Sequence, residues 1–188
     1  GQALCEAVMG SLVEVINNHK EEFNAQAIAM IANGASKCGH KLCEAVMGSL
    51  EDQINKHKEE FNAQDLAMIA NGASKCEQAL CEKVMESLEG EINKHNDEFE
   101  PQAIAMIANG ASKCGQALCE KVMESLEDGI NKYNDKFEPQ HLAMIANGAS
   151  KCGDRLCESV MGSLEGVIDD HKNEFNEQGI AMIANGAS

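Results

Sequence analysis

The chain has 188 residues, of which 44% are hydrophobic and only 3% aromatic, and its formal net charge is −16. It contains no run of 18 apolar residues and no charged-then-apolar leader, so neither a membrane span nor a signal peptide is predicted. A negative net charge repels nucleic acid at long range, and the scarcity of aromatics predicts a core of Leu, Ile, Val, Met, Ala and Cys.

The sequence repeats itself every 38 residues. The segment AMIANGASKC recurs letter for letter and is cut to AMIANGAS in the last copy. Each unit of such an array buries its apolar face on its neighbours. We therefore predict one all-α repeat domain over residues 1–188, an α-solenoid of about ten helices stacked as hairpins in a right-handed superhelix. The five units are 1–38, 39–76, 77–114, 115–152 and 153–188.

Each unit opens with an amphipathic helix, named helix B here. In the second unit, apolar residues recur every four positions, which places them on one face of a helix over about residues 40–57. These residues are Leu42, Val46, Leu50 and Ile54. The array therefore begins with a helix B and ends with the other helix of the hairpin.

The second helix of each unit is named helix A. In the second unit Asn62 is a predicted N-cap, and Pro101 and Pro139 stand at the N1 position of later copies, where a missing N–H costs nothing. The helix is expected to run to about Cys76. Its Asn71-Gly72 pair has two interpretations. The glycine allows a close approach between helices, or the pair ends the helix in a loop, because Gly costs roughly 1 kcal/mol inside a helix.

The charges are distributed unevenly between the two helices. The helix-A segments contain four lysines but only two acidic residues, Asp65 and Glu177, so the acid belongs to helix B and the links. On a helical wheel of the first helix A, the buried side is Ile28, Ala32 and Ala35, with Ile31 at its margin. The opposite side is Gln26, Met30, Asn33 and Lys37. Helix A is therefore expected to present a face free of acid.

The exposed face of helix A has the chemistry of a nucleic-acid interface. Asn can read a base edge, Met can pack on a base and Lys can hold a phosphate, so five copies would follow a strand at about one nucleotide per repeat. The third residue of helix A varies between otherwise near-identical units, as a specificity position would. The alternative is that this face packs on the neighbouring helix A and that the variation is drift at an exposed site. The predicted binding residues are Ala27, Asp65, Ala103, His141 and Gly179 at the variable position, with Asn33, Asn71, Asn109, Asn147, Lys37, Lys75, Lys113 and Lys151.

The nine cysteines occupy only two positions of the repeat. Cys38 and Cys43 straddle a turn between two helices, with no second pair at zinc spacing nearby, so no metal site is predicted. Buried small hydrophobes are the favoured interpretation, with a redox or disulfide role as the alternative. A reducing intracellular compartment, an organelle or the cytosol of a bacterium or its host, is expected.

No residue pattern indicates catalysis. Four histidines share the end of helix B, but Tyr133 stands at the same position in the fourth unit, so the position does not require imidazole. A cation near a helix C-terminus explains them. No Ser/His/Asp arrangement and no phosphate-binding glycine loop is present, so neither an enzyme nor a cofactor is predicted.

Two known families are similar to parts of the repeat. Residues 61–67, FNAQDLA, and 99–105, FEPQAIA, resemble the FNPQDLA opening of octotricopeptide repeats, whose unit has the same length. That resemblance, which covers every copy, implies an RNA-binding α-solenoid that acts on organellar transcripts. Residues 107–110, IANG, and 116–122, QALCEKV, also resemble transcription-activator-like effector repeats, which would imply DNA as the partner.

Single-stranded RNA is therefore the expected partner, with DNA as the runner-up. The remaining alternative is a protein-binding or structural scaffold, natural or designed as a consensus. Neither end of the array has a polar capping repeat, so end-to-end self-stacking through the terminal helices is a further expectation.

Overall fold

The structure is a computed structural model that describes residues 2–187, and within them it contains ten α-helices joined by turns and short 3-10 segments. The five long helices, the B helices, are α1 (Gln2–His19), α3 (His40–His57), α5 (Gln78–Lys94), α7 (Gln116–Lys132) and α9 (Asp154–Asp170). The five short helices, the A helices, are α2 (Ala25–Ala35), α4 (Ala63–Ala73), α6 (Pro101–Ala111), α8 (Pro139–Ala149) and α10 (Glu177–Gly186). The predicted all-α solenoid is confirmed.

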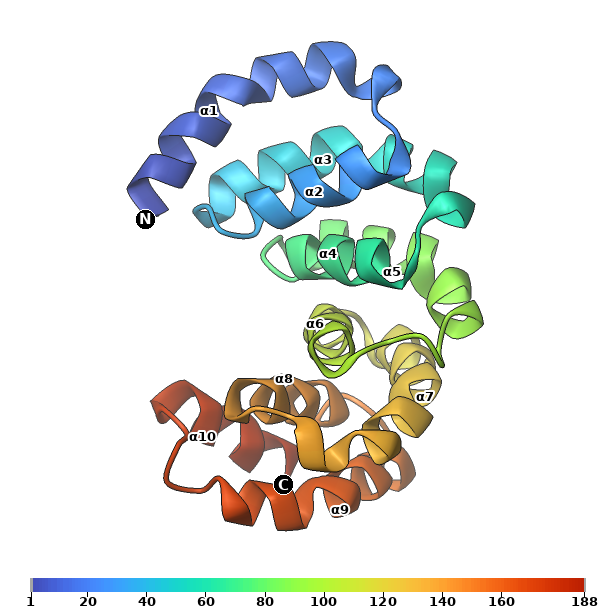
Figure 1. Cartoon of the computed structure of the whole chain (residues 1–188), viewed down its shortest axis with the longest axis vertical. Coiled ribbons are helices and arrows are strands. Elements are labelled where there is room, and N and C mark those ends of the chain that lie inside the picture. Colours follow the sequence, from blue (N-terminus) through green and yellow to red (C-terminus); the bar gives the residue numbers. More distant parts are fainter. Residues whose placement is uncertain (1, 188) are drawn as a thin grey trace.

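The helices form two curved layers. Each A helix packs beside the A helix of the next unit, from α2 through to α10, and the B helices pack beside one another in the same order. In Figure 1 the layers follow an arc, with α4 and α6 toward its inner side and α5 and α7 on its outer side. A B helix packs mainly on the A helix that precedes it in the chain, and touches the A helix of its own unit much less. The packed hairpin therefore straddles the boundary between two units.

The A helices begin where the sequence predicts. The side chain of Asn62 accepts a hydrogen bond of 2.9 Å from the backbone N–H of Asp65, and Asn24 and Asn176 cap α2 and α10 in the same way. Such a cap satisfies one of the backbone donors that the first turn of a helix leaves unpaired. Pro101 and Pro139 occupy N1, as predicted.

The A helices end about three residues earlier than predicted. After α4 ends at Ala73, the N–H groups of Lys75 and Cys76 bond to the carbonyls of Gly72 and Ala73 at 3.1 and 2.9 Å. These short-range bonds tighten the last turn and end the α-helix, and the next B helix begins a few residues later. The Asn-Gly pair lies inside the helix, so the interpretation of this pair as a loop is wrong.

The glycine of that pair allows neighbouring A helices to approach closely. A Cβ added to Gly72 would lie 2.9 Å from the backbone oxygen of Ala32 and 2.9 Å from the sulfur of Met47. The same contact recurs at Gly110 and Gly148, where the neighbouring backbone oxygen would be 3.1 Å away. Glycine therefore lets the Ala-rich and Ile-rich sides of the A helices pack closely on one another and on the B helices, which forms one continuous core.

Within the described residues, no helix is long and apolar enough to cross a membrane.

Candidate binding groove

A groove of about 770 Å³ runs along the A helices. It is lined mainly by α8 and α10, by the links before these two helices and by the turns that follow α2, α4 and α6. Met144 and Met182 contribute flexible apolar surface to it, and Gln140 and Gln178 contribute amides. These residues repeat the face that the helical wheel placed opposite the buried side. The predicted buried and exposed sides are confirmed in α2, where Ile28 is fully buried and Met30 is 60% exposed.

A ladder of hydrogen bonds joins successive A helices beside this groove. The side-chain nitrogen of Asn71 donates to the hydroxyl of Ser36 at 3.0 Å and to the amide oxygen of Asn33 at 3.3 Å. Asn147 and Asn185 donate to the corresponding serines, Ser112 and Ser150, at 2.9 and 2.8 Å. These asparagines therefore contribute to packing between units, as the alternative interpretation expected.

Asn109 differs from the other asparagines of the ladder. Within the described residues its side chain makes no hydrogen bond, and it lines the groove. A half-buried amide without a protein partner can offer two donors and one acceptor to a ligand. Asn109 is therefore the predicted asparagine best placed to bind a ligand.

The variable third position of helix A has a local structural role in two units. Asp65 is 5% exposed, and its carboxylate accepts a hydrogen bond from the backbone N–H of Asn62. The Nδ1 atom of His141 accepts one from the N–H of Glu138, and burial lowers the pKa of His141, which favours the neutral imidazole that can accept. Asp65 and His141 thus close capping boxes. The sequence signal for this role was Asn or Glu placed three residues earlier.

The other three variable residues offer little side-chain chemistry. Ala27 and Ala103 are half-buried, and Gly179 is buried at the start of α10, where its N–H is bonded to Asn176. Gly179 lines the groove, although it has no side chain to read a ligand. The structure therefore brings the variable position to the helix N-termini, where helix capping explains at least two of its residues.

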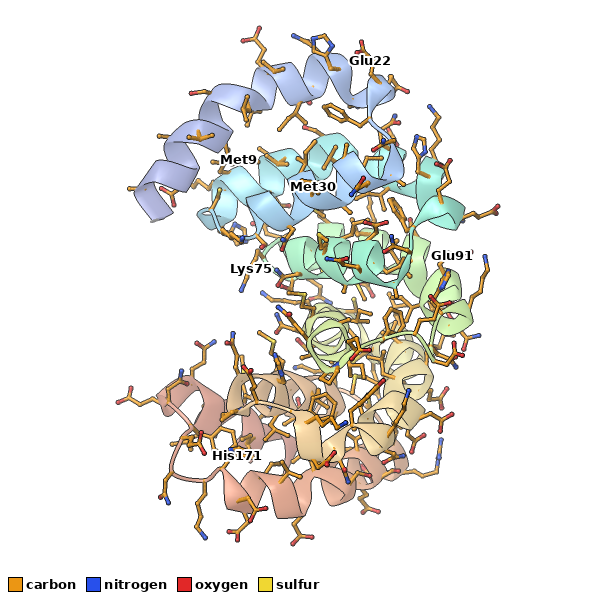
Figure 2. All side chains as sticks on the ribbon, in the orientation of Figure 1. Met9, Glu22, Met30, Lys75, Glu91 and His171 are labelled. Carbon is orange, nitrogen blue, oxygen red and sulfur yellow. The ribbon has the colours of Figure 1, made fainter. Side chains whose placement is uncertain are left out.

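The four predicted lysines are exposed in the turns after the A helices, and none of them forms an ion pair within residues 2–187. Lys75 and Lys113 line the groove. Figure 2 shows Lys75 on the inner side of the arc and Glu91 on the outer side. Glu138 and Glu174, from the links before α8 and α10, also line the groove. The expectation of an acid-free face therefore holds for the A helices but not for the groove.

Comparison with known proteins identifies the architecture but no sequence family. No family model matches the chain, and no curated protein matches it. Among solved structures, the chain is similar to a designed armadillo repeat protein in complex with the peptide (KR)4, at 11% identity and a TM-score of 0.52. The match covers 97% of this chain and 80% of the designed protein. The chain is a helical-repeat solenoid. Its resemblance to octotricopeptide and effector repeats stays a prediction.

Proposed function

We propose that the chain binds an extended peptide segment of another protein along the groove of its A helices. The unpaired amide of Asn109 at the groove carries the proposal. An extended peptide presents backbone N–H and C=O groups, and an Asn side chain can both donate to and accept from them. Met144 and Met182 can adapt to the side chains of such a peptide. The similar designed armadillo repeat protein was solved in complex with a peptide, which supports peptide binding as the function proposed here.

The charge distribution favours a basic peptide. The chain has a net charge of −16, and two carboxylates, Glu138 and Glu174, lie in the groove. A strongly acidic protein attracts cationic ligands over a range set by the ionic strength. Lys75 and Lys113 lie at the groove as well and can pair with an acidic residue or with the C-terminal carboxylate of the ligand. We therefore propose a peptide of net positive charge that carries an acidic group.

Titration of a fluorescein-labelled (Lys-Arg)4 peptide, followed by anisotropy, tests this proposal. We expect the double variant Asn109→Ala/Met144→Ala to bind about tenfold more weakly, because it removes the amide and the apolar contact. The matched control is Asn55→Ala, an exposed asparagine on helix α3 that does not line this groove. Equal affinities of the double variant and the wild type, or no binding of the peptide, would contradict the proposal.

Single-stranded RNA is the second candidate, because the turn after the A helix of each complete unit carries an exposed lysine that has no ion-pair partner among residues 2–187. The same titration with a randomised RNA pool distinguishes the two candidates. RNA binding that weakens with salt, and with Lys37, Lys75, Lys113 and Lys151 all changed to Ala, would favour RNA over peptide. DNA is less well supported, because the Asn-Gly pair that the effector comparison would use lies within a packed helix.

We also propose that a second copy of the chain stacks end to end on the first. Leu12 on α1 is 41% exposed, whereas its counterpart Leu50 is fully buried against the preceding unit. At the other end Ile180 on α10 is 55% exposed, whereas its counterpart Leu142 is fully buried. The first unit also has valines, Val13 and Val15, where the second has Glu51 and Gln53. The α10 face of one copy therefore fits the α1 face of another, as α8 fits α9.

Sedimentation of two charged variants tests the stacking and its direction. Leu12→Glu places a charge on the exposed apolar face of α1, and Ile180→Lys places one on the exposed apolar face of α10. Each variant is therefore expected to stay monomeric, whereas the wild type is expected to associate as its concentration rises. An equimolar mixture is expected to form dimers, because each variant retains the face that the other lacks. Association of either variant alone would indicate a like-with-like interface, and a monomeric wild type at millimolar concentration would reject stacking altogether.

A further inference from the structure

Each of the three middle units brings two thiols to one buried carbonyl. In the second unit the sulfur of Cys43, on α3, lies 3.5 Å from the backbone oxygen of Gly72, and the sulfur of Cys76, after α4, lies 3.6 Å from the same atom. The arrangement recurs with small variations at Gly110 and Gly148. The corresponding thiols are Cys81 and Cys114 at 3.5 and 3.7 Å, and Cys119 and Cys152 at 3.4 and 3.6 Å.

This pairing differs from the one that the sequence suggests. Along the chain Cys38 and Cys43 are near neighbours across a turn, whereas the structure joins Cys43 to Cys76 across a whole hairpin. The two thiols also lie close enough for each to shift the pKa of the other, and this is the largest cause of the shift at Cys43 and at Cys76. The shared acceptor makes the two sulfurs of each pair neighbours, and it recurs in three units.

We propose that these three pairs are internal disulfide sites, Cys43–Cys76, Cys81–Cys114 and Cys119–Cys152, which form when the chain meets a small disulfide oxidant such as oxidised glutathione. The geometric basis is the shared glycine carbonyl. The fifth unit lacks the second position, so Cys157, whose sulfur lies 3.2 Å from the Gly186 oxygen, has no partner within its own unit.

The exchange proceeds in two steps. The thiolate of one cysteine attacks a sulfur of oxidised glutathione, and one glutathione thiolate leaves. The second cysteine then attacks the mixed disulfide and expels the other glutathione thiolate. Two protein thiols and one glutathione disulfide become one protein disulfide and two glutathione molecules, which take up the two protons.

Differences in burial set the order of reaction. The thiolate is the nucleophile, so glutathione must reach a thiol before that thiol can react. Cys43 is fully buried whereas Cys152 is partly exposed, so the Cys119–Cys152 disulfide forms first. The buried pairs react only when their units open locally.

A disulfide at these sites would change the mechanics of the array. The two helices of one unit touch each other little, because each B helix packs mainly on the preceding A helix. The bond would join α3 to the turn after α4 and so add a constraint that the noncovalent packing lacks. We expect oxidation to raise the midpoint of thermal unfolding and the reduced chain to recover its original midpoint.

Tandem mass spectrometry after digestion without reduction tests the proposal. The folded chain is incubated with oxidised glutathione, and its remaining thiols are alkylated before digestion. We expect the three proposed linkages, an alkylated Cys157, and a thermal midpoint higher by about 5 °C that dithiothreitol reverses. The variant Cys76→Ser should lose the Cys43–Cys76 linkage and retain the other two.

Four results would overturn the proposal. They are linkages across the turns, such as Cys38–Cys43 or Cys76–Cys81, glutathione adducts without internal disulfides, thiols that react only in denaturant, and an oxidised chain that unfolds at the same temperature as the reduced one. The Cys119→Ser variant checks the predicted order, because it should convert the fastest linkage into a glutathione adduct at Cys152.

Discussion

Replacement of Gly72 by alanine is expected to destabilise the chain by about 2 kcal/mol, even though alanine is the better helix former by about 1 kcal/mol. The added Cβ would lie 2.9 Å from the backbone oxygen of Ala32, an atom of the neighbouring helix that cannot rotate away. Relief of this contact requires α2 and α4 to separate, which opens the packing of two units. Urea unfolding followed by circular dichroism measures the change.

Gly34 is the matched control for Gly72. It stands at the same repeat position in α2, but the nearest atom to an added Cβ is the sulfur of Met9, at an ordinary contact distance of 3.9 Å. Gly34→Ala is therefore expected to stabilise the chain by up to about 1 kcal/mol through helix propensity. If both substitutions shift the urea midpoint in the same direction, close approach of the A helices is not the reason for the repeated glycine.

Phe99→Ala is expected to cost about 3 to 5 kcal/mol, the usual range for removal of a buried phenylalanine. Phe99 precedes the N-cap of α6, is 1% exposed, and belongs to the continuous core. Its loss leaves a cavity between the start of an A helix and the surrounding core. The same urea experiment checks the prediction.

Phe175, at the same repeat position before α10, provides the comparison. It is only half-buried, because among the described residues α10 packs on a neighbouring A helix on one side, that of α8. Phe175→Ala is therefore expected to cost clearly less than Phe99→Ala. Equal losses would indicate that this phenylalanine acts within its own unit, for example on the helix start, and not in the packing between units.

The first residues of the A helices could be predicted from the local sequence. Asn62 caps α4 and Pro139 begins α8 as predicted, because capping bonds and the fixed geometry of proline involve residues only a few positions apart. The role of Asp65 and His141 was equally local, since both bond to a residue three positions earlier. The sequence contained that signal, but the variation between units at this position suggested ligand recognition instead.

The groove depends on contacts between units. The bond from Asn71 to Ser36 and the lack of one at Asn109 distinguish residues that are identical in their local sequence. Glu138 and Glu174 reach the groove because the links fold beside the A helices, which the charge count by segment did not reveal. A repeated sequence therefore predicts which face is available, but not which copy of a residue is free to bind.

The sequence by itself determined the period, the two helices of each unit, their starting residues and their buried sides, because these follow from hydrogen bonds and side-chain spacing within a few residues. The tertiary structure decided the rest. It showed that Gly72 serves the contact with Ala32, that Cys43 faces Cys76, and that each B helix packs on the preceding A helix. These relations join positions a whole helix or repeat apart, and their distances are fixed only when the helices pack.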